Sequence, residues 1–202
     1  MVVGGAVLPH PPIILPAYEG ERQDRARATI ESVQAASRWL AEELRPDRLV
    51  VSSPHEGHGF DVPLAFVEQA LGRLPPVERL LTMHPSYAWY AERGEELRAR
   101  EATRAERVAV IASGDGSHRL SPEGPYGFHP LAPALEQALE EGIRAGRPES
   151  LLTIDPDTVR EGAECGLRSF IFGLAAVQPS RCDVLSHEAP FGVGYLVATL
   201  HR

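Results

Sequence analysis

The sequence predicts an α/β fold: a single-domain mixed β-sheet sandwiched by helices, with a metal site at the carboxyl ends of the strands. Three observations support this prediction. Apolar, β-branched runs resembling buried parallel strands occupy residues 2–8, 49–53 and 108–113. Amphipathic helical patterns lie between these runs. Finally, a histidine follows each run, at the edge of an open α/β sheet where ligands bind.

In the first half of the chain, the spacing of apolar residues predicts helices over residues 22–44 and 87–104. Arg45-Pro46-Asp47 ends the first helix and leads into the second strand. Residues 56–60 are expected to form a loop that carries His58. Residues 61–74 fit a helix or a loop.

In the second half, we expect a helix over residues 131–145 that stops at Gly146. Another helix is expected from Asp155, placed as its N-cap, to about Val177. Two closing strands are predicted at residues 182–185 and 193–200, and the linker between them suggests a hairpin or edge pairing.

Composition restricts the classes of function. The 202 residues fit one domain, 1–202, and 43% of them are hydrophobic, enough for a full core. A net charge of -8 argues against a nucleic-acid partner, which needs a basic face. The longest apolar stretches are too short to span a membrane, and no basic signal head starts the chain, so we expect a cytoplasmic protein.

The numbers of cysteines and lysines exclude further classes of function. The two cysteines, Cys165 and Cys182, do not make a disulfide framework, and no CxxC pair indicates structural zinc. The chain contains no lysine, which excludes Schiff-base chemistry on a lysine and a P-loop.

The histidines are the strongest functional signal. His10 lies between prolines that stiffen the backbone, and His55 follows Pro54. His118 follows a Gly-Asp-Gly turn in which Asp115 could orient an imidazole. Imidazole is both a common neutral metal ligand and a general acid/base near neutral pH. Three of them at neighbouring strand ends predict a metal-dependent site, although each could instead simply cap a strand end.

Two alternatives remain open at this point. The glycine-rich turn before His118 could cradle a phosphate, although no lysine or strict GxGxxG accompanies it. Two histidines with one carboxylate would make the facial triad of non-haem Fe(II) oxygenases. The carboxylate could come from Glu164, on a predicted helix, or from Glu188, between the last two strands.

Six motifs in order resemble the LigB-type class III extradiol ring-cleaving dioxygenase superfamily. They begin at Pro9, Ser53, Ser113, Gly124, Glu164 and Pro190, and read PHPP, SPH, SGDGSHRL, GPYG, ECGLR and PFGVGY. The resemblance covers nearly the whole chain. It is nearest to the small form related to Memo and to the N-terminal domain of AMMECR1 fusion proteins.

The resemblance implies roles for individual residues. His10, His55 and Glu164 would bind Fe(II) or another divalent metal, and Glu188 is the alternative to Glu164 as the carboxylate ligand. His118 would be the catalytic acid/base, with Asp115 beside it. Memo-type relatives carry a cysteine near the Glu164 position, so the adjacent Cys165 could be a thiol ligand or have a redox role.

The implied reaction is extradiol cleavage of a small aromatic diol by O₂. The competing hypothesis is a Memo-like metal-binding or interaction protein without ring cleavage, with an AMMECR1-type or radical-enzyme protein as its partner. A bound metal could also support hydrolysis. We further expect a homo-oligomer, and neither a nucleic acid nor a membrane as partner.

Overall fold

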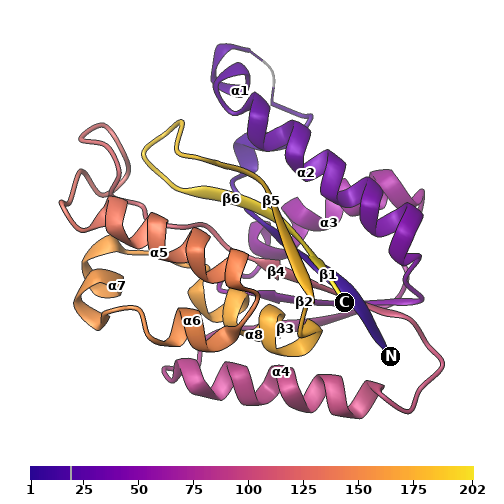
Figure 1. Ribbon diagram of the computed structural model, residues 1–202. Helices are drawn as coiled ribbons and strands as arrows, with labels where there is room; N and C mark the ends of the chain where they lie inside the picture. Colours follow the sequence, from indigo (N-terminus) through magenta and orange to yellow (C-terminus); the bar gives the residue numbers. More distant parts are fainter. Residues whose placement is uncertain (19) are drawn as a thin grey trace.

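The structure is a computed structural model that describes residues 1–18 and 20–202; the side chains of Glu21 and Arg22, at the start of the first predicted helix, lie outside the described part. Its centre is a six-stranded sheet of order β3-β2-β4-β1-β6-β5 (Figure 1). The strands are β1 (Val2–Leu8), β2 (Arg48–Ser53), β3 (Val77–Leu81), β4 (Val108–Ser113), β5 (Arg181–Glu188) and β6 (Tyr195–His201).

The sheet is mixed, as predicted. The pairs β1–β4, β2–β4 and β2–β3 are parallel, whereas β6 runs antiparallel to both β1 and β5. In the parallel part, Leu8 lies beside Ser113, and Ser52 lies beside Ala112. The three predicted strands therefore end at the same edge of the sheet, which is where their histidines follow.

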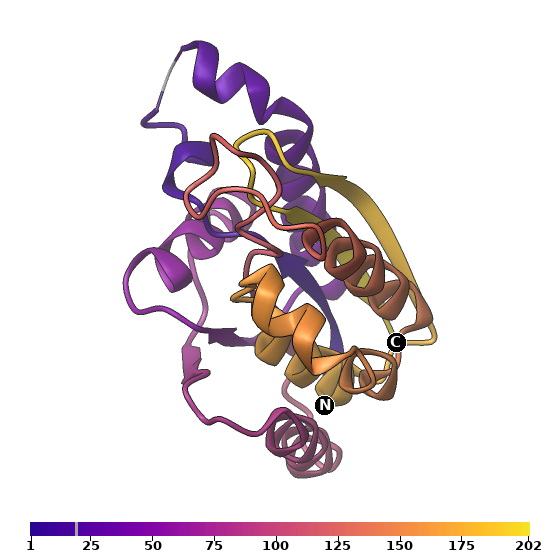
Figure 2. The ribbon, with the colours of Figure 1, turned by 90° about the vertical axis from the view of Figure 1, so that its left-hand side faces the viewer.

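Helices cover both faces of the sheet (Figures 1 and 2). On one face α2 packs against β5 and β6, and α3 packs against β2 and β4; on the other, α8 packs against β1, β2 and β4, and α5 packs against β5. The helical elements are η1 (Pro12–Ile14), α1 (Glu21–Arg25), α2 (Arg27–Trp39), η2 (Leu40–Leu44), α3 (His58–Leu71), α4 (Tyr87–Glu101), α5 (Ala132–Ala145), α6 (Pro148–Leu152), α7 (Pro156–Gly162) and α8 (Leu167–Val177). Within the described ranges, none of these is long and apolar enough to cross a bilayer.

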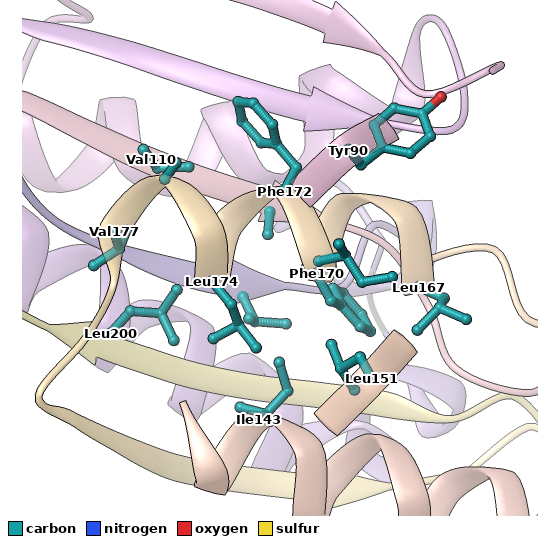
Figure 3. Packing of buried hydrophobic residues seen from close by; sticks show 14 of the residues in the cluster. Tyr90, Val110, Ile143, Leu151, Leu167, Phe170, Phe172, Leu174, Val177 and Leu200 are labelled. Carbon is teal, nitrogen blue, oxygen red and sulfur yellow. The ribbon is translucent and has the colours of Figure 1, made fainter. Parts of the chain in front are cut away.

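The larger apolar core surrounds α8, which is buried along almost its whole length. Figure 3 shows Phe170 and Leu174 of this helix among side chains of α5 and α6, including Ile143 and Leu151. Each of these four side chains is at most 1% exposed. Because α8 packs rigidly against three parallel strands, the segment at its N-terminus is held against their carboxyl ends.

The helix predicted from Asp155 to Val177 is wrong in one respect: it is two helices, α7 and α8. Asp155 does cap α7, accepting a 2.8 Å hydrogen bond from the Thr158 N–H. The chain then leaves the helix at Ala163, whose φ of 52° is left-handed. The break is held by tertiary contacts, since the Gly166 N–H donates to the Asp115 carbonyl over 2.9 Å.

Other boundaries also differ from the predictions. The first helix is divided into α1, α2 and the π-helical η2, and the ambiguous region forms α3. Because α3 starts at His58, that residue begins a helix and does not lie in a loop. The sequence pattern missed α6 and β3. Strand β3 is an edge strand with the charged residues Glu78 and Arg79, so it lacks the apolar run of a buried strand.

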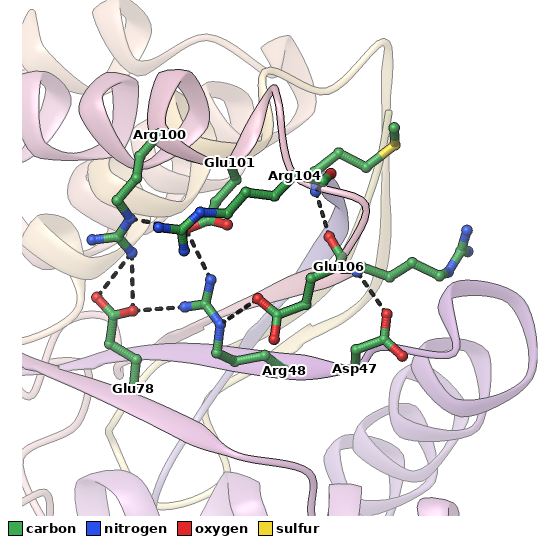
Figure 4. A network of polar contacts seen from close by, with 9 residues as sticks. Asp47, Arg48, Glu78, Arg100, Glu101, Arg104 and Glu106 are labelled. Carbon is green, nitrogen blue, oxygen red and sulfur yellow. Dashed lines mark hydrogen bonds and ion pairs between the residues drawn. The ribbon is translucent and has the colours of Figure 1, made fainter.

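Opposite the histidine edge, charged residues join β2, β3 and α4 (Figure 4). Glu101 is fully buried, and its Oε1 lies 2.8 Å from both Arg48 and Arg100. Glu78 contacts the same two arginines, at 2.7 and 2.9 Å, but is more exposed. This network ties the sheet edge to α4 at the end away from the site.

Candidate metal centre

His10 is the central residue of the site. It follows β1 and is 1% exposed. Its Nδ1 lies 3.0 Å from the Ser113 hydroxyl oxygen, and that hydroxyl donates its hydrogen to the Gly59 carbonyl over 2.5 Å. Since a hydroxyl has one hydrogen, Ser113 accepts from His10 Nδ1–H. The lone pair of His10 is therefore on Nε2, which is free to bind a metal.

His55 and His58 stand beside His10. The three ring centroids are separated by 5.2 to 5.3 Å, and one potential ligand atom from each ring lies within 4.8 Å of the others. His55 follows β2 as predicted, whereas His58 comes from the first turn of α3. The described residues therefore include a three-imidazole cluster at the carboxyl edge of the sheet.

His10 and His55 are held in the form that binds metals. Burial, reinforced by the neighbouring rings of His55, His58 and His118, lowers the pKa of His10 to about 3. Burial also lowers the pKa of His55, with further effects from His58 and His118. Neutral imidazole is the metal-binding state, so His10 needs no deprotonation near pH 7.

A second set of donors shares His10. The Cys165 sulfur is 3.6 Å from His10 Nε2, and one Asp115 carboxylate oxygen is 3.8 Å from the same nitrogen. Asp115 also accepts a 3.0 Å hydrogen bond from the His10 backbone N–H. Burial raises the pKa of Asp115 to about 7 and raises that of the Cys165 thiol, so metal binding by either would release a proton where it is protonated.

His118 lies close enough to His10 and His55 to influence their pKa values. Its Nδ1 is 2.9 Å from the Ala163 carbonyl, which can only accept, so Nδ1 carries the hydrogen. Its Nε2 is then the basic nitrogen. Burial lowers the pKa of His118, although hydrogen bonds with backbone groups oppose that effect. The arrangement leaves an oriented, neutral imidazole beside the cluster.

The two candidate carboxylates do not join the donor groups found among the described residues. Glu164 accepts a 2.5 Å hydrogen bond from the Leu167 N–H at the start of α8, and burial raises its pKa to about 7. Glu188 accepts from the backbone N–H and the hydroxyl of Thr29, at 2.9 and 2.5 Å. Both carboxylates thus already accept hydrogen bonds from backbone N–H groups.

Some members of the site were less apparent in the sequence. The sequence marks Ser113, which sets the tautomer of His10, only as part of a strand and a motif. Glu136, a buried carboxylate from α5, gave no signal because it lies in a run of helical Glu residues that normally face water. The sequence predicts a loop at His58, whereas the start of α3 brings its ring to the cluster.

The fold and the site define an α/β domain with candidate metal-binding side chains at the carboxyl edge of a mixed sheet. The chain belongs to the LigB family: residues 56–198 match the family described as the catalytic LigB subunit of aromatic ring-opening dioxygenase. His58, His118 and Cys165 lie inside the matched range, His55 immediately precedes it, and His10 lies outside it, near the start of the chain.

The chain is also similar to two other proteins. Protein CA_C1420 of Clostridium acetobutylicum is 33% identical over 150 residues, which cover 71% of this chain and 31% of that protein. The chain thus spans about a third of the curated relative's length. The crystal structure of uncharacterized protein JW3007 from Escherichia coli K12 has a TM-score of 0.63 at 12% identity, covering 98% of this chain and 99% of that one. This second likeness concerns the fold alone.

Proposed function

We propose that this chain is an Fe(II)-dependent, extradiol-type dioxygenase domain that opens the ring of a small aromatic diol with O₂. The observation that carries the proposal is the cluster of His10, His55 and His58 at the carboxyl edge of the sheet, in a chain of the LigB family. The donor set fits a divalent metal, because His10 and His55 offer neutral nitrogen atoms on rigid loops. Bound Fe(II) would supply the electron transfer that allows O₂ to react with a diol.

The protein's own residues would position and deprotonate the substrate. His10 and His55 would hold the metal, and Ser113 would keep the lone pair of His10 on Nε2. His118 would take a proton from a substrate hydroxyl at its Nε2 and later return it, while the Ala163 carbonyl holds Nδ1–H. Asp115 would fix the backbone of His10. Both atoms of O₂ would enter the ring-opened product.

The third ligand separates this proposal from a second candidate function. We propose Glu164 as the carboxylate ligand of the metal. To bind the metal, its carboxylate would have to give up the hydrogen bond that it accepts from the Leu167 N–H. The Cys165 sulfur is already 3.6 Å from His10 Nε2. That distance favours the second candidate, a metal-binding protein with a thiolate ligand and no ring cleavage.

The wider biological setting is also a proposal. We propose that the partner is an AMMECR1-type or radical-enzyme protein. We also propose that the chain self-associates and that it is located in the cytoplasm. The support for a partner is that the curated relative contains much sequence beyond the region shared with this chain.

Anaerobic loading with Fe(II), followed by addition of catechols and O₂, tests the proposed reaction. We expect about one iron per chain, O₂ consumption and a yellow ring-opened product. His10→Ala should lose the iron; His118→Ala should keep it but form no product. His129→Ala, outside both donor groups, is the matched control. Full iron binding by His10→Ala would refute the ligand assignment, and iron loss in His118→Ala would refute the acid/base role.

A further inference from the structure

His58 has no assigned role in the proposed reaction, yet its ring stands within the histidine cluster. The centroid of this ring is 5.3 Å from that of His10 and 5.2 Å from that of His55. One nitrogen or other ligand atom from each of the three rings lies within 4.8 Å of the other two. Atoms this close can be brought onto one metal ion by side-chain rotation, without movement of the backbone.

The backbone next to His58 is tied to the His10 ring. The Ser113 hydroxyl donates its hydrogen to the Gly59 carbonyl over 2.5 Å, and the oxygen of the same hydroxyl lies 3.0 Å from His10 Nδ1. The residue that follows His58 therefore takes part in the hydrogen-bond chain that leaves His10 Nε2 free.

The first turn of α3 is also packed closely against the segment that carries His55. A Cβ atom at Gly59 would lie 2.1 Å from the Ser53 hydroxyl oxygen and 3.0 Å from the Cβ atom of His55. Glycine at position 59 lets the two segments approach this closely. Phe60, which is 1% exposed, fixes the same turn in the apolar core. His58 is thus an exposed side chain on a backbone that the fold holds in place.

His58 differs in this respect from the carboxylate of Glu164. Glu164 accepts the Leu167 N–H and is in neither of the donor groups found among the described residues, whereas His58 belongs to one of them together with His10. Imidazole is the commonest protein ligand of metal ions, and two histidines three residues apart can offer both rings to one ion.

We propose that His58 is a third imidazole ligand, so that His10, His55 and His58 together bind a divalent metal ion. Three imidazoles with a further position open form a donor set that holds Zn²⁺ in other proteins. A ligand from the segment between α7 and α8, Glu164 or Cys165, adds to this set. The inference rests on the proposed function for the presence of a metal, and it does not require ring cleavage.

Anaerobic titration of the metal-free chain with Co²⁺ tests the assignment, because the visible absorption of bound Co²⁺ depends on its ligands. We expect wild type to bind about one Co²⁺ per chain. His58→Ala should change the absorption bands and weaken binding by about tenfold or more, since even the loss of a group that orients a ligand costs that much. Free imidazole should restore the bands in this variant, because position 58 is exposed. Glu56→Ala, an exposed residue of the same segment, is the matched control.

The outcomes separate the ligand assignment from the proposed reaction. Wild-type affinity and absorption in His58→Ala, or an equal loss of affinity in Glu56→Ala, would overturn the assignment. Weaker binding with unchanged absorption bands would also overturn it, because the substitution would then act on the fold and not on the coordination.

The expected Co²⁺ results in a protein whose Fe(II) form opens no catechol would support His58 as a ligand and contradict the proposed reaction. Unchanged Co²⁺ binding in His58→Ala, together with ring opening by Fe(II)-loaded wild type, would overturn the assignment and leave the reaction standing.

Discussion

Glu136 Oε1 accepts a 2.5 Å hydrogen bond from the backbone N–H of Ser117, the residue before His118. The other carboxylate oxygen of Glu136 lies 2.6 Å from His187 Nε2. Helix α5 and strand β5 are thereby joined to the loop that carries the proposed acid/base. Glu136 is 8% exposed, so this is a buried, charge-assisted connection.

The backbone around Glu136 is shaped for its carboxylate. A Cβ atom at Gly116 would lie 2.3 Å from a Glu136 oxygen, and a Cβ atom at Gly194 would lie 1.8 Å from one. Only glycine lets both segments approach so closely. The Glu136 carboxylate therefore explains why glycine occupies positions 116 and 194, in the motifs SGDGSHRL and PFGVGY.

We expect Glu136→Ala to lower the free energy of unfolding by about 2 kcal/mol, since it leaves the buried Ser117 N–H unpaired. Turnover should fall further than iron binding, because the loop holding His118 loosens while His10 and His55 stay in place. Glu136→Gln, which keeps an acceptor for Ser117, should recover part of both losses. Urea unfolding and iron titration measure these effects; unchanged stability in Glu136→Ala would contradict them.

The contacts of His187 with Glu136 and Glu140 should make the free energy of unfolding depend on pH. Burial alone would lower the pKa of His187, but hydrogen bonds to Glu136 and Glu140 outweigh it and raise the pKa. Because the pKa of His187 is higher in the folded state, its protonation stabilises the fold. This contribution is fully present at pH values below the unfolded-state pKa of about 6.5, and it is lost as the pH rises through the folded-state pKa. The stability difference between wild type and His187→Gln should therefore shrink with rising pH in unfolding curves. A difference that stays constant with pH would refute the linkage.

Substitutions at two adjacent residues discriminate the third metal ligand. If Glu164 completes the site, Glu164→Gln should weaken iron binding at least tenfold, and Cys165→Ser should change it little. If the thiol is the ligand, the effects reverse, and Cys165→Ser should weaken Zn²⁺ binding more than binding of the harder Fe(II). Metal titrations of both variants give the answer. Equal, wild-type affinity in both would exclude each residue as a ligand.

The ion network opposite the site predicts a stability difference between two glutamates. Glu101→Gln should cost about 3 kcal/mol of unfolding free energy, because it leaves the largely buried Arg48 and the half-exposed Arg100 without their central carboxylate. Glu78→Gln, whose side chain is 44% exposed, should cost less than about 1 kcal/mol. Chemical denaturation of both variants is the measurement. Similar costs for the two would show that burial does not set the strength of this network.

The main part of the sheet could be predicted because its signals are local. Residues 2–8 and 108–113 are continuous apolar runs, and such runs form the buried parallel strands β1 and β4. Strand β3 could not be predicted in the same way. Its edge position lets charged side chains replace the apolar run, so the identity of β3 depends on pairing with β2.

The sequence by itself determined that His10, His55 and His118 follow strands ending at one edge, because strand direction follows from local patterns and short connections. Tertiary structure alone decided which donors meet. Glu164 and Cys165 are neighbours in the segment between α7 and α8, which contacts with Asp115 hold. Glu164 nevertheless accepts a hydrogen bond from the Leu167 N–H at the start of α8, whereas Cys165 lies near His10. The positions of His58 and Glu136 were likewise decided by packing between elements distant in sequence, which no local pattern encodes.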